Sequence, residues 1–348
     1  MEIYVIGVNY KTTPVQIREK FSIEQHEYKN ILSSIKALDG IMECALLSTC
    51  NRTELHIFSE NTLADTGYIE KKFCILKGLD IYEVKKYLYI YEGINAIRHI
   101  MKVASGMDSM IIGEDQILGQ FKRAYEISIK HGTSKAVLNT LSRLAITASK
   151  KLHTRNLFLN KVTSVAGQAV LLLEDIFGES IRTKNILIIG SGEIGKTICC
   201  KLQELGVAKI YITQRNGILT KEFNQSSVNI ISYKDRYSFI EESDVVMGAT
   251  SSPHYIITQD MLEKELISTN KKHIFIDLAV PRDFDEAISK SENIELYNID
   301  QLKSFKLKNV KDQGHNQLDM NYIEAQINCH INEFIRWYKY RNTLLKKV

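Results

Sequence analysis

The stretch from Lys184 to Gln214 constrains the fold of this 348-residue chain more than any other. An apolar run, residues 185–189, leads directly into a glycine-rich turn, and a helical pattern and a second apolar run follow at residues 196–205 and 209–213. Glycines at the first, third and sixth positions of the turn permit a tight bend, close approach to a pyrophosphate, and close packing of the helix on the strand. This pattern predicts part of a doubly wound, Rossmann-type parallel sheet. The predicted dinucleotide-binding turn consists of Gly190, Ser191, Gly192, Glu193, Ile194 and Gly195.

The end of the second apolar run indicates which dinucleotide binds. An NAD site usually has an acidic residue there, which accepts a hydrogen bond from the ribose 2′-hydroxyl. This chain instead has Thr213, Gln214 and Arg215, and a guanidinium suits a 2′-phosphate. We therefore expect NADPH as the cofactor, the alternative being that Arg215 only points to solvent. Two later runs, residues 244–250 and 273–278, end in loops of small residues. Such loops line the cofactor crevice, so we expect Thr250, Ser251 and residues 279–281 beside the nicotinamide.

Polar and reactive residues interrupt an apolar pattern between Ala45 and Phe58, which predicts a strand, an exposed turn and a second strand. Cys50 lies at this turn, between Thr49 and the pair Asn51 and Arg52. Nearby donors and a fixed positive charge favour the thiolate that a cysteine nucleophile requires. The alternative is a small buried cysteine, but the polar neighbours on both sides favour the nucleophile.

Length and composition are those of a globular protein with two or three domains, because 348 residues exceed the size of a single core. No stretch approaches about 18 consecutive apolar residues, and the first residues do not form a signal peptide, so we expect a cytoplasmic protein. The six cysteines have no Cys-x-x-Cys spacing, which argues against a disulfide framework and against a metal site.

The net charge is only +4, but the positive charge is concentrated between Phe121 and Lys161. Nine lysines or arginines lie there against one acidic residue, Glu126. Clustered cations on helices can follow a phosphate backbone, the alternative being a solvated helix face. The positively charged residues are Lys122, Arg123, Lys130, Lys135, Arg143, Lys150, Lys151, Arg155 and Lys161.

The remaining patterns predict an α+β first domain and a long C-terminal helix. Strands are expected at residues 2–9 and 87–91, and helices at residues 15–21, 24–38, 63–76, 94–104, 116–131, 134–157 and 164–177. From about Val310 onward the chain has one helical pattern that contains Phe334 and Trp337. We divide the multi-domain α/β chain into residues 1–155, 156–305 and 306–348.

The turn at Cys50 resembles the active-site signature of a known family. The sequence Ser-Thr-Cys-Asn-Arg-Thr-Glu, residues 48–54, is similar to that of the glutamyl-tRNA reductases, which reduce glutamate esterified to tRNA to glutamate-1-semialdehyde. The resemblance continues over nearly the whole chain, in the family's order and approximate spacing, through residues 7–9, 11–14, 18–20, 104–110, 113–114 and 116–120.

The resemblance implies NADPH-dependent reduction of glutamyl-tRNA(Glu), the first step of five-carbon tetrapyrrole (porphyrin) synthesis. It implies that Cys50 attacks the aminoacyl ester and forms a thioester, and that His99 protonates the leaving oxygen. Arg52 would clamp the γ-carboxylate of the glutamyl group. The other implied substrate contacts are Thr49, Asn51, Ser109, Glu114, Asp115, Gln116 and Gln120. The first domain would bind glutamyl-tRNA and the second NADP.

Three departures from the family pattern occur, at Tyr10, at Asp115 and at residues 214–216, and none removes a reacting group. Two other functions stay open. One is an NADP-dependent reductase of a small free acid or keto compound, since this sheet hosts many chemistries. The other is an inactive tRNA-binding or scaffold protein.

The C-terminal residues resemble the beginning of the family's helical dimerisation domain, so we expect a long linker helix and a shortened dimerisation region. The helix either pairs with a symmetry mate or folds back on its own subunit. An exposed stripe containing Phe334 and Trp337 would favour a weak homodimer. The family resemblance also implies handover of the product to glutamate-1-semialdehyde aminomutase.

Overall fold

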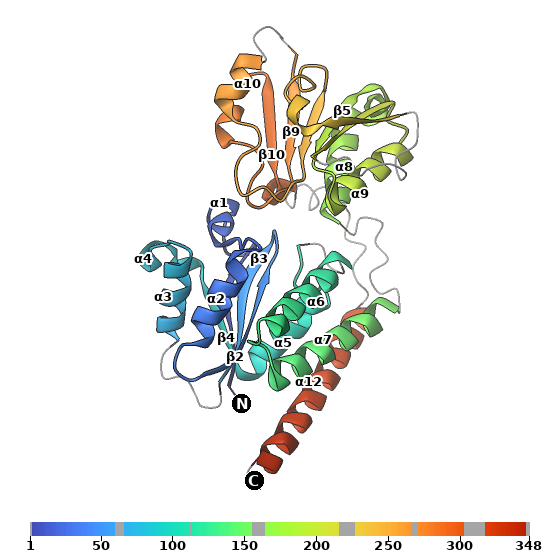
Figure 1. Cartoon of the computed structure of the whole chain (residues 1–348). Helices are drawn as coiled ribbons and strands as arrows, with labels where there is room; N and C mark the ends of the chain where they lie inside the picture. The colour runs from blue at the N-terminus through green and yellow to red at the C-terminus, as the bar shows by residue number, and fades with distance from the viewer. Residues whose placement is uncertain are drawn as a thin grey trace. The chain divides into compact units, whose positions relative to one another are not determined.

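The computed structural model describes residues 2–59, 66–110, 113, 115–154, 164–215, 227–265, 271–302 and 317–345. They form two compact units, one of Met1–Thr163 with Asp312–Val348 and one of Ser164–Lys311 (Figure 1). The grouping differs from our three-part division, because the C-terminal residues join the first unit. None of the helices in these ranges is long and apolar enough to span a membrane.

The first unit is built on a four-stranded antiparallel sheet with the order β2-β3-β1-β4. Its strands are β1 (Glu2–Asn9), β2 (Ile41–Ser48), β3 (Arg52–Ser59) and β4 (Tyr89–Glu92). Strands β2 and β3 form a hairpin, closed by a hydrogen bond of 2.8 Å from the Thr49 amide to the Arg52 carbonyl. Cys50 therefore lies at the tip of a hairpin, which confirms the predicted strand–turn–strand arrangement.

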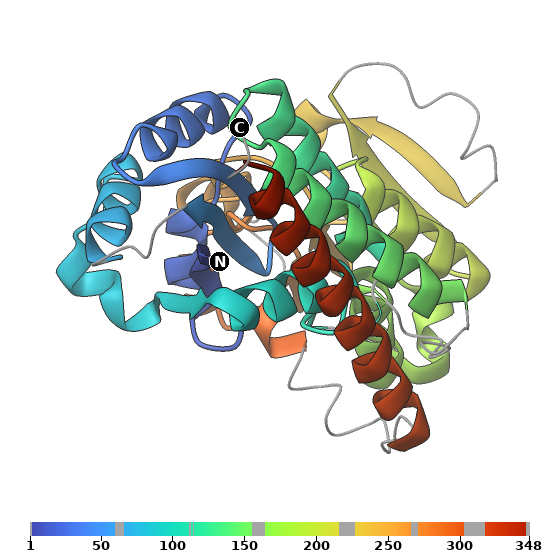
Figure 2. The same cartoon turned by 90° about the horizontal axis from the view of Figure 1, so that it is seen from below.

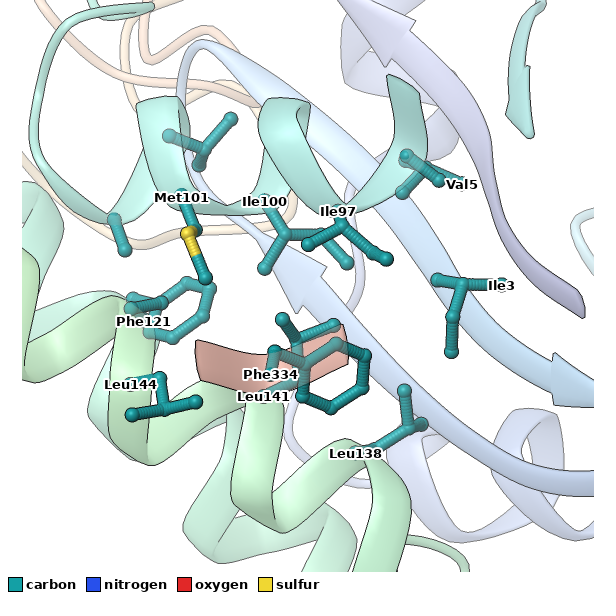
Figure 3. Close-up of a cluster of buried hydrophobic side chains, with 14 of the residues drawn as sticks. Ile3, Val5, Ile97, Ile100, Met101, Phe121, Leu138, Leu141, Leu144 and Phe334 are labelled. Carbon is teal, nitrogen blue, oxygen red and sulfur yellow. The ribbon is translucent and has the colours of Figure 1, made fainter. Parts of the chain in front are cut away.

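Helices cover both faces of this sheet. They are α1 (Val15–Arg18), α2 (Glu27–Lys36), α3 (Gly67–Leu76), α4 (Ile81–Val84), α5 (Gly93–Ala104), α6 (Asp115–Lys130) and α7 (Ala136–Thr154). One core lies between the sheet and α2 and α3, and receives Leu55 and Ile57 of β3. The other lies between the sheet and α5, α6 and α7 (Figure 3). It receives Phe58 of β3. Successive residues of β3 thus point into different cores.

The long C-terminal helix α12 (Gln317–Leu345) packs on α5 and α7 of the first unit (Figures 1 and 2). Its apolar residues recur every three or four positions and enter the same core as Phe58; they are Ile323, Ile327, Ile331, Phe334 and Tyr338. The expectation that Phe334 belongs to an exposed stripe was wrong, because its side chain is fully buried within its own subunit. The apolar residues of α12 pack against α5 and α7 of the same chain, and this packing removes their apolar surface from water.

The second unit contains a six-stranded parallel sheet with the order β10-β9-β8-β5-β6-β7. The strands are β5 (Asn185–Ile189), β6 (Lys209–Gln214), β7 (Val228–Ser232), β8 (Val245–Gly248), β9 (His273–Asp277) and β10 (Ile294–Asn298). The helices are α8 (Val165–Phe177), α9 (Glu193–Glu204) and α10 (Gln259–Glu265). Strand order reverses between β5 and β8, which is the point where a dinucleotide-binding sheet opens its crevice. The predicted Rossmann-type fold is confirmed.

Candidate active site and cofactor-binding turn

The turn that carries Cys50 is held by two polar side chains, those of Thr49 and Arg18. The Thr49 hydroxyl accepts hydrogen bonds of 3.2 Å from the amides of Asn51 and Arg52. The buried Arg18 side chain reaches the turn from α1, donating to the Cys50 carbonyl at 3.4 Å and to the Thr13 carbonyl at 2.8 Å. Cys50 is half-buried, whereas Cys44 and Cys74 in the same unit are buried. Its setting is that of an accessible thiol on a fixed turn.

Below this turn, β3 presents a row of buried charged and polar side chains. Arg52, Glu54 and His56 alternate along the strand, so they share the face that α5 and α6 cover. Glu54 and His56 are completely buried and Arg52 is 2% exposed. Burial of a charged group costs free energy because the group leaves water, so buried charges are paired, and they often occur at functional sites.

Glu54 is the centre of a hydrogen-bond network. One carboxylate oxygen, Oε1, accepts from Arg52 at 2.7 Å, from the Tyr89 hydroxyl at 2.5 Å and from His99 Nε2 at 3.0 Å. The other, Oε2, lies 3.0 Å from His56 Nε2. Because His99 projects from α5, the network ties that helix to the sheet and fixes the imidazole, whose ring also stacks on Tyr91 at 4.4 Å.

The electrostatics of the network favour a carboxylate at Glu54. Burial alone would raise the pKa of Glu54, but His99 and Arg52 hold it well below its ordinary value. Burial lowers the pKa of His56, so this imidazole is neutral. It can then donate from Nε2 to Glu54 and accept at Nδ1 from the Tyr125 hydroxyl, which lies 2.8 Å away.

Arg52 does not present an open guanidinium. Besides Glu54, it binds Asp108, whose side-chain oxygen Oδ2 lies 3.0 Å from Nη1 and whose carbonyl accepts from Nη2. The expected clamp on a substrate carboxylate is therefore occupied by a carboxylate of the protein. The next residue, Ser109, is buried, and its carbonyl accepts a hydrogen bond of 3.0 Å from the Tyr10 hydroxyl.

The other predicted substrate contacts occupy different positions. Asn51 is 6% exposed, and its side-chain oxygen has no hydrogen-bond partner within the described ranges. Gln116 is half-buried and Gln120 exposed on α6. Glu114 lies outside the described residues, as does the side chain of Asp115, where α6 begins. Sequence analysis missed Glu54, His56, Tyr89 and Asp108 as site residues; the available signal was the Arg-x-Glu-x-His alternation in an otherwise apolar strand.

Six of the positively charged residues noted in the sequence are exposed on or beside α6 and α7 and can contact a large anion. They are Arg123, Lys130, Lys135, Arg143, Lys150 and Lys151. Lys122 is half-buried, while Arg155 and Lys161 lie outside the described residues.

The glycine turn of the second unit leaves no room for side chains at two of its positions. A Cβ atom at Gly190, where φ is +117°, would lie 2.5 Å from the Ala249 carbonyl oxygen, and one at Gly195 would lie 1.9 Å from the Gly190 carbonyl oxygen. A Cβ atom at Gly192 would meet nothing within 4 Å. Helix α9 begins directly after it, at Glu193, so its first amides lie at the turn. The turn thus fits a pyrophosphate, with Ser191 and Ile194 as further turn residues.

Arg215 follows the end of β6, where the cofactor prediction placed it. It is exposed, and its guanidinium lies over the Tyr233 ring at 4.4 Å. Thr250 follows β8 and is held by Asp283, which accepts from the Thr250 amide at 2.8 Å and from its hydroxyl. Burial raises the pKa of Asp283 to about 6. Ser251 is exposed beside them.

Comparisons with known proteins find family models that match each of the two units. A family model described as the glutamyl-tRNAGlu reductase N-terminal domain matches residues 6–156, and a shikimate / quinate 5-dehydrogenase model matches residues 171–305. The glutamyl-tRNA reductase of Thermodesulfovibrio yellowstonii is 35% identical over 327 residues, which is 90% of this chain and 75% of the relative. That of Carboxydothermus hydrogenoformans is 34% identical over 342 residues, 97% of this chain and 75% of the relative.

A solved structure is similar over almost the full length. The glutamyl-tRNA reductase from Methanopyrus kandleri has a TM-score of 0.50 and 26% identity, and the match covers 97% of this chain and 80% of that one. Because relatives that are 34 to 35% identical match at least 90% of this chain, and because the N-terminal family model matches residues 6–156, the chain belongs to the glutamyl-tRNA reductase family.

Proposed function

We propose that this chain reduces glutamyl-tRNA(Glu) to glutamate-1-semialdehyde with release of tRNA, using NADPH, as the first step of five-carbon tetrapyrrole synthesis. The observation that carries the proposal is the position of Cys50. Its thiol is accessible at a hairpin tip whose backbone is fixed, and a carboxylate–histidine pair, Glu54 and His99, is buried in the same unit. A cysteine nucleophile requires access and fixed geometry together.

The proposed reaction has two stages, formation of a thioester on Cys50 and its reduction to the aldehyde. The Cys50 thiolate attacks the ester carbonyl carbon, so that a C–S bond forms and the C–O bond to the tRNA ribose breaks. The ribose oxygen leaves with a proton, which His99 would supply from Nδ1, because its Nε2 atom is bonded to Glu54 Oε1. A reduced nicotinamide cofactor, when bound to the second unit, would supply the hydride for the thioester. Cys50 then leaves as a thiolate and the glutamyl group departs as the aldehyde.

The second unit would hold the cofactor through its own residues. Residues 190–195 would take the pyrophosphate at the start of α9, and Thr250 and Ser251 would lie beside the nicotinamide. Arg215 would bind the 2′-phosphate, which is the basis for preferring NADPH to NADH.

The partners are proposals of the same kind. The first unit would bind glutamyl-tRNA, with the exposed cations of α6 and α7 along its phosphates. Charged tRNA also places the reaction in the cytoplasm. A homodimer and handover of the aldehyde to glutamate-1-semialdehyde aminomutase follow only from the family. The homodimer no longer has the support of an exposed stripe, since Phe334 is buried.

One experiment tests the proposed function against its alternatives. The protein is incubated with NADPH and glutamyl-tRNA, with and without ribonuclease pretreatment, and NADPH oxidation is followed. We expect RNA-dependent oxidation that Cys50→Ser abolishes, because a hydroxyl cannot replace the thiolate without a strong base. A labelled glutamyl adduct should form on the wild type when NADPH is withheld. Cys329→Ser, which changes an exposed cysteine of α12, is the control.

The other functions give different results in this assay. A reductase of small acids or keto compounds would oxidise NADPH without RNA when such a compound is supplied. A tRNA-binding protein without catalysis would retain the RNA and oxidise nothing. Appreciable activity of Cys50→Ser would reject the covalent mechanism.

A further inference from the structure

The buried guanidinium of Arg52 already holds a carboxylate that belongs to the protein. Asp108 contacts it twice, through its side chain at Nη1 and through its carbonyl at Nη2. The exposed fractions of the two side chains are 1% for Arg52 and 15% for Asp108. Asp108 is therefore the more exposed member of this buried pair.

Asp108 also has a second partner that is open to water. Its Oδ1 atom pairs with the Lys11 ammonium, whose side chain is 47% exposed, while Oδ2 pairs with Arg52. Burial alone would raise the pKa of Asp108, but Arg52 and Lys11 hold it below its ordinary value, so the group is a carboxylate at neutral pH. One oxygen can leave Arg52 while the other stays paired.

Backbone hydrogen bonds hold the segment that carries Asp108. The loop is closed at its base by a hydrogen bond of 3.1 Å from the Gly113 amide to the Gly106 carbonyl, and both glycines have positive φ, +81° and +72°. The Tyr10 hydroxyl binds the next carbonyl, that of Ser109, at 3.0 Å. A rotation of the Asp108 side chain would release the contact between Oδ2 and Nη1, while Glu54 and the Asp108 carbonyl remain bound to the guanidinium.

We propose that Asp108 is an internal substitute for the substrate's side-chain carboxylate: it occupies Arg52 in the empty enzyme, and the glutamyl γ-carboxylate displaces it onto Lys11. This assignment rests on the proposed function. Glu54 and the Asp108 carbonyl stay bound to Arg52 throughout. Exchange of one carboxylate for another also keeps the contact at Nη1 that Asp108 now makes filled in both states, so that no buried donor is left unpaired.

The exchange has a consequence for affinity and another for selectivity. Displacement of Asp108 reduces the binding of every side chain that must reach Arg52. The neutral amide of a glutaminyl substrate must also displace Asp108, but it forms only a weaker, uncharged hydrogen bond with Arg52. Arg52 therefore determines the ratio of the affinities for glutamyl-tRNA and glutaminyl-tRNA, while Asp108 lowers both affinities.

The test is the variant Asp108→Asn, which retains an acceptor for Arg52 but removes the competing charge. We expect the KM for glutamyl-tRNA to fall roughly tenfold, which is the difference between a charged and a neutral hydrogen bond. The KM for glutaminyl-tRNA should fall by a similar factor, so that the ratio of the two is unchanged. Asp39→Asn, an exposed change in the same unit, is the matched control and should alter neither value.

A measurement without RNA separates this inference from the proposed function. Glutarate, a five-carbon dicarboxylate, should protect Cys50 from alkylation by iodoacetamide at a concentration roughly tenfold lower in Asp108→Asn than in the wild type. If the wild type shows no RNA-dependent NADPH oxidation, the proposed function fails while the glutarate result still decides the exchange. A KM for glutamyl-tRNA and a protecting concentration that are unchanged or raised in a folded Asp108→Asn would overturn the exchange.

Two further variants complete the test, one as a replacement if Asp108→Asn does not fold and one at Lys11. Thermal melting shows whether Asp108→Asn is folded. If its melting transition is lost, Asp108→Ser is used instead, and the same decrease in the KM for glutamyl-tRNA and in the protecting concentration of glutarate is expected. Lys11→Met removes the group that receives the displaced carboxylate, so the protecting concentration of glutarate should rise. Changes of the same sign in the Asp108 and Lys11 variants would contradict the exchange.

Discussion

At the scale of single residues, Glu54 is an anion placed where water does not reach. Arg52, His56, Tyr89 and His99 compensate its charge through hydrogen bonds of 2.5 to 3.0 Å. A buried ion pair adds little net stability, but removal of one member leaves the other charge unpaired. The stability of the first unit should therefore depend strongly on this one carboxylate.

We predict that Glu54→Gln lowers the free energy of unfolding at pH 7 by about 3 kcal/mol, because Arg52 loses its most buried anionic partner. The folded-state pKa of Glu54 is below its unfolded value, so the carboxylate contributes stability above about pH 4.3, and this contribution is lost as the pH falls through the folded-state pKa. The difference in the free energy of unfolding between variant and wild type should have its full value at pH 7 and become smaller only below about pH 4.

Urea unfolding at several pH values measures this difference, with Glu83→Gln, an exposed change on α4, as the control. A gap that grows as the pH falls would mean that Glu54 is protonated in the folded protein.

Arg215 provides a residue-scale test of cofactor choice. Arg215→Ala should raise the KM for NADPH roughly tenfold or more and leave that for NADH nearly unchanged, since only the 2′-phosphate contact is lost. Steady-state kinetics with both cofactors measure the effect. Arg182→Ala, at an exposed arginine of the same unit, is the control. Equal effects on NADPH and NADH would place Arg215 outside the phosphate site.

Residue-level sequence reasoning located the turn but not the groups beneath it. Cys50 was found because polar neighbours interrupt an apolar pattern. Glu54 and His56 were missed because charged residues that alternate with Leu55 and Ile57 read as the solvated face of a strand. Burial of that face is decided by α5 and α6, which are distant in sequence. The same holds for Asp108, whose pairing with Arg52 bridges residues 56 positions apart.

At the scale of elements, the pairing of β1 with β3 depends on Gly7. It lies opposite Glu54, and a Cβ atom there would be 2.3 Å from the Thr53 carbonyl oxygen and 2.9 Å from the Glu54 Cα. We predict that Gly7→Ala costs more than about 2 kcal/mol of stability, because the strands must separate and the Glu54 network shifts with them.

The matched control is Gly119→Ala in α6, where a Cβ atom would meet nothing within 4 Å. This change should leave stability equal or raise it by up to about 1 kcal/mol, since alanine is the better helix former. Thermal or urea unfolding compares the two variants. Equal effects would mean that the close approach of β1 and β3 is not required.

Elements with continuous apolar runs or clear helical periodicity were predictable. The strands β1, β2, β3, β5 and β6 and helices such as α5 and α9 lie where the sequence indicated. Strands β7 and β10 and helix α10 were not predicted. Both strands lie at sheet edges and mix polar with apolar residues over only five positions, without regular alternation, and α10 has seven residues. Such short amphipathic segments acquire their structure from neighbours rather than from their own pattern.

At the scale of the whole molecule, α12 completes the core of the unit that contains Cys50. We predict that Ile327→Ala, at a fully buried position of α12, destabilises the first unit by about 3 kcal/mol and leaves the second unchanged. Trp337, the one tryptophan of the chain, lies on α12, so its fluorescence reports on the first unit alone. Circular dichroism, which includes both units, should show the second transition unmoved.

Asn332→Ala, at an exposed position of the same helix, is the control and should shift neither transition by more than about 0.5 kcal/mol. A fluorescence midpoint that does not change in Ile327→Ala would show that α12 contributes little to the core.

The return of the chain to its first unit imposes an order on synthesis. As the polypeptide leaves the ribosome, residues 164–311 emerge as one uninterrupted stretch and can fold while translation continues. The unit begun at the N-terminus must wait, because Ile323, Ile327 and Phe334 of its core are made after the entire nucleotide-binding sheet. Until then, apolar side chains of α5 and α7 stay uncovered, and the nascent chain carries a surface that chaperones recognise. The unit that contains Cys50 therefore completes its core only after the nucleotide-binding sheet has been made, although Cys50 precedes that sheet in the chain.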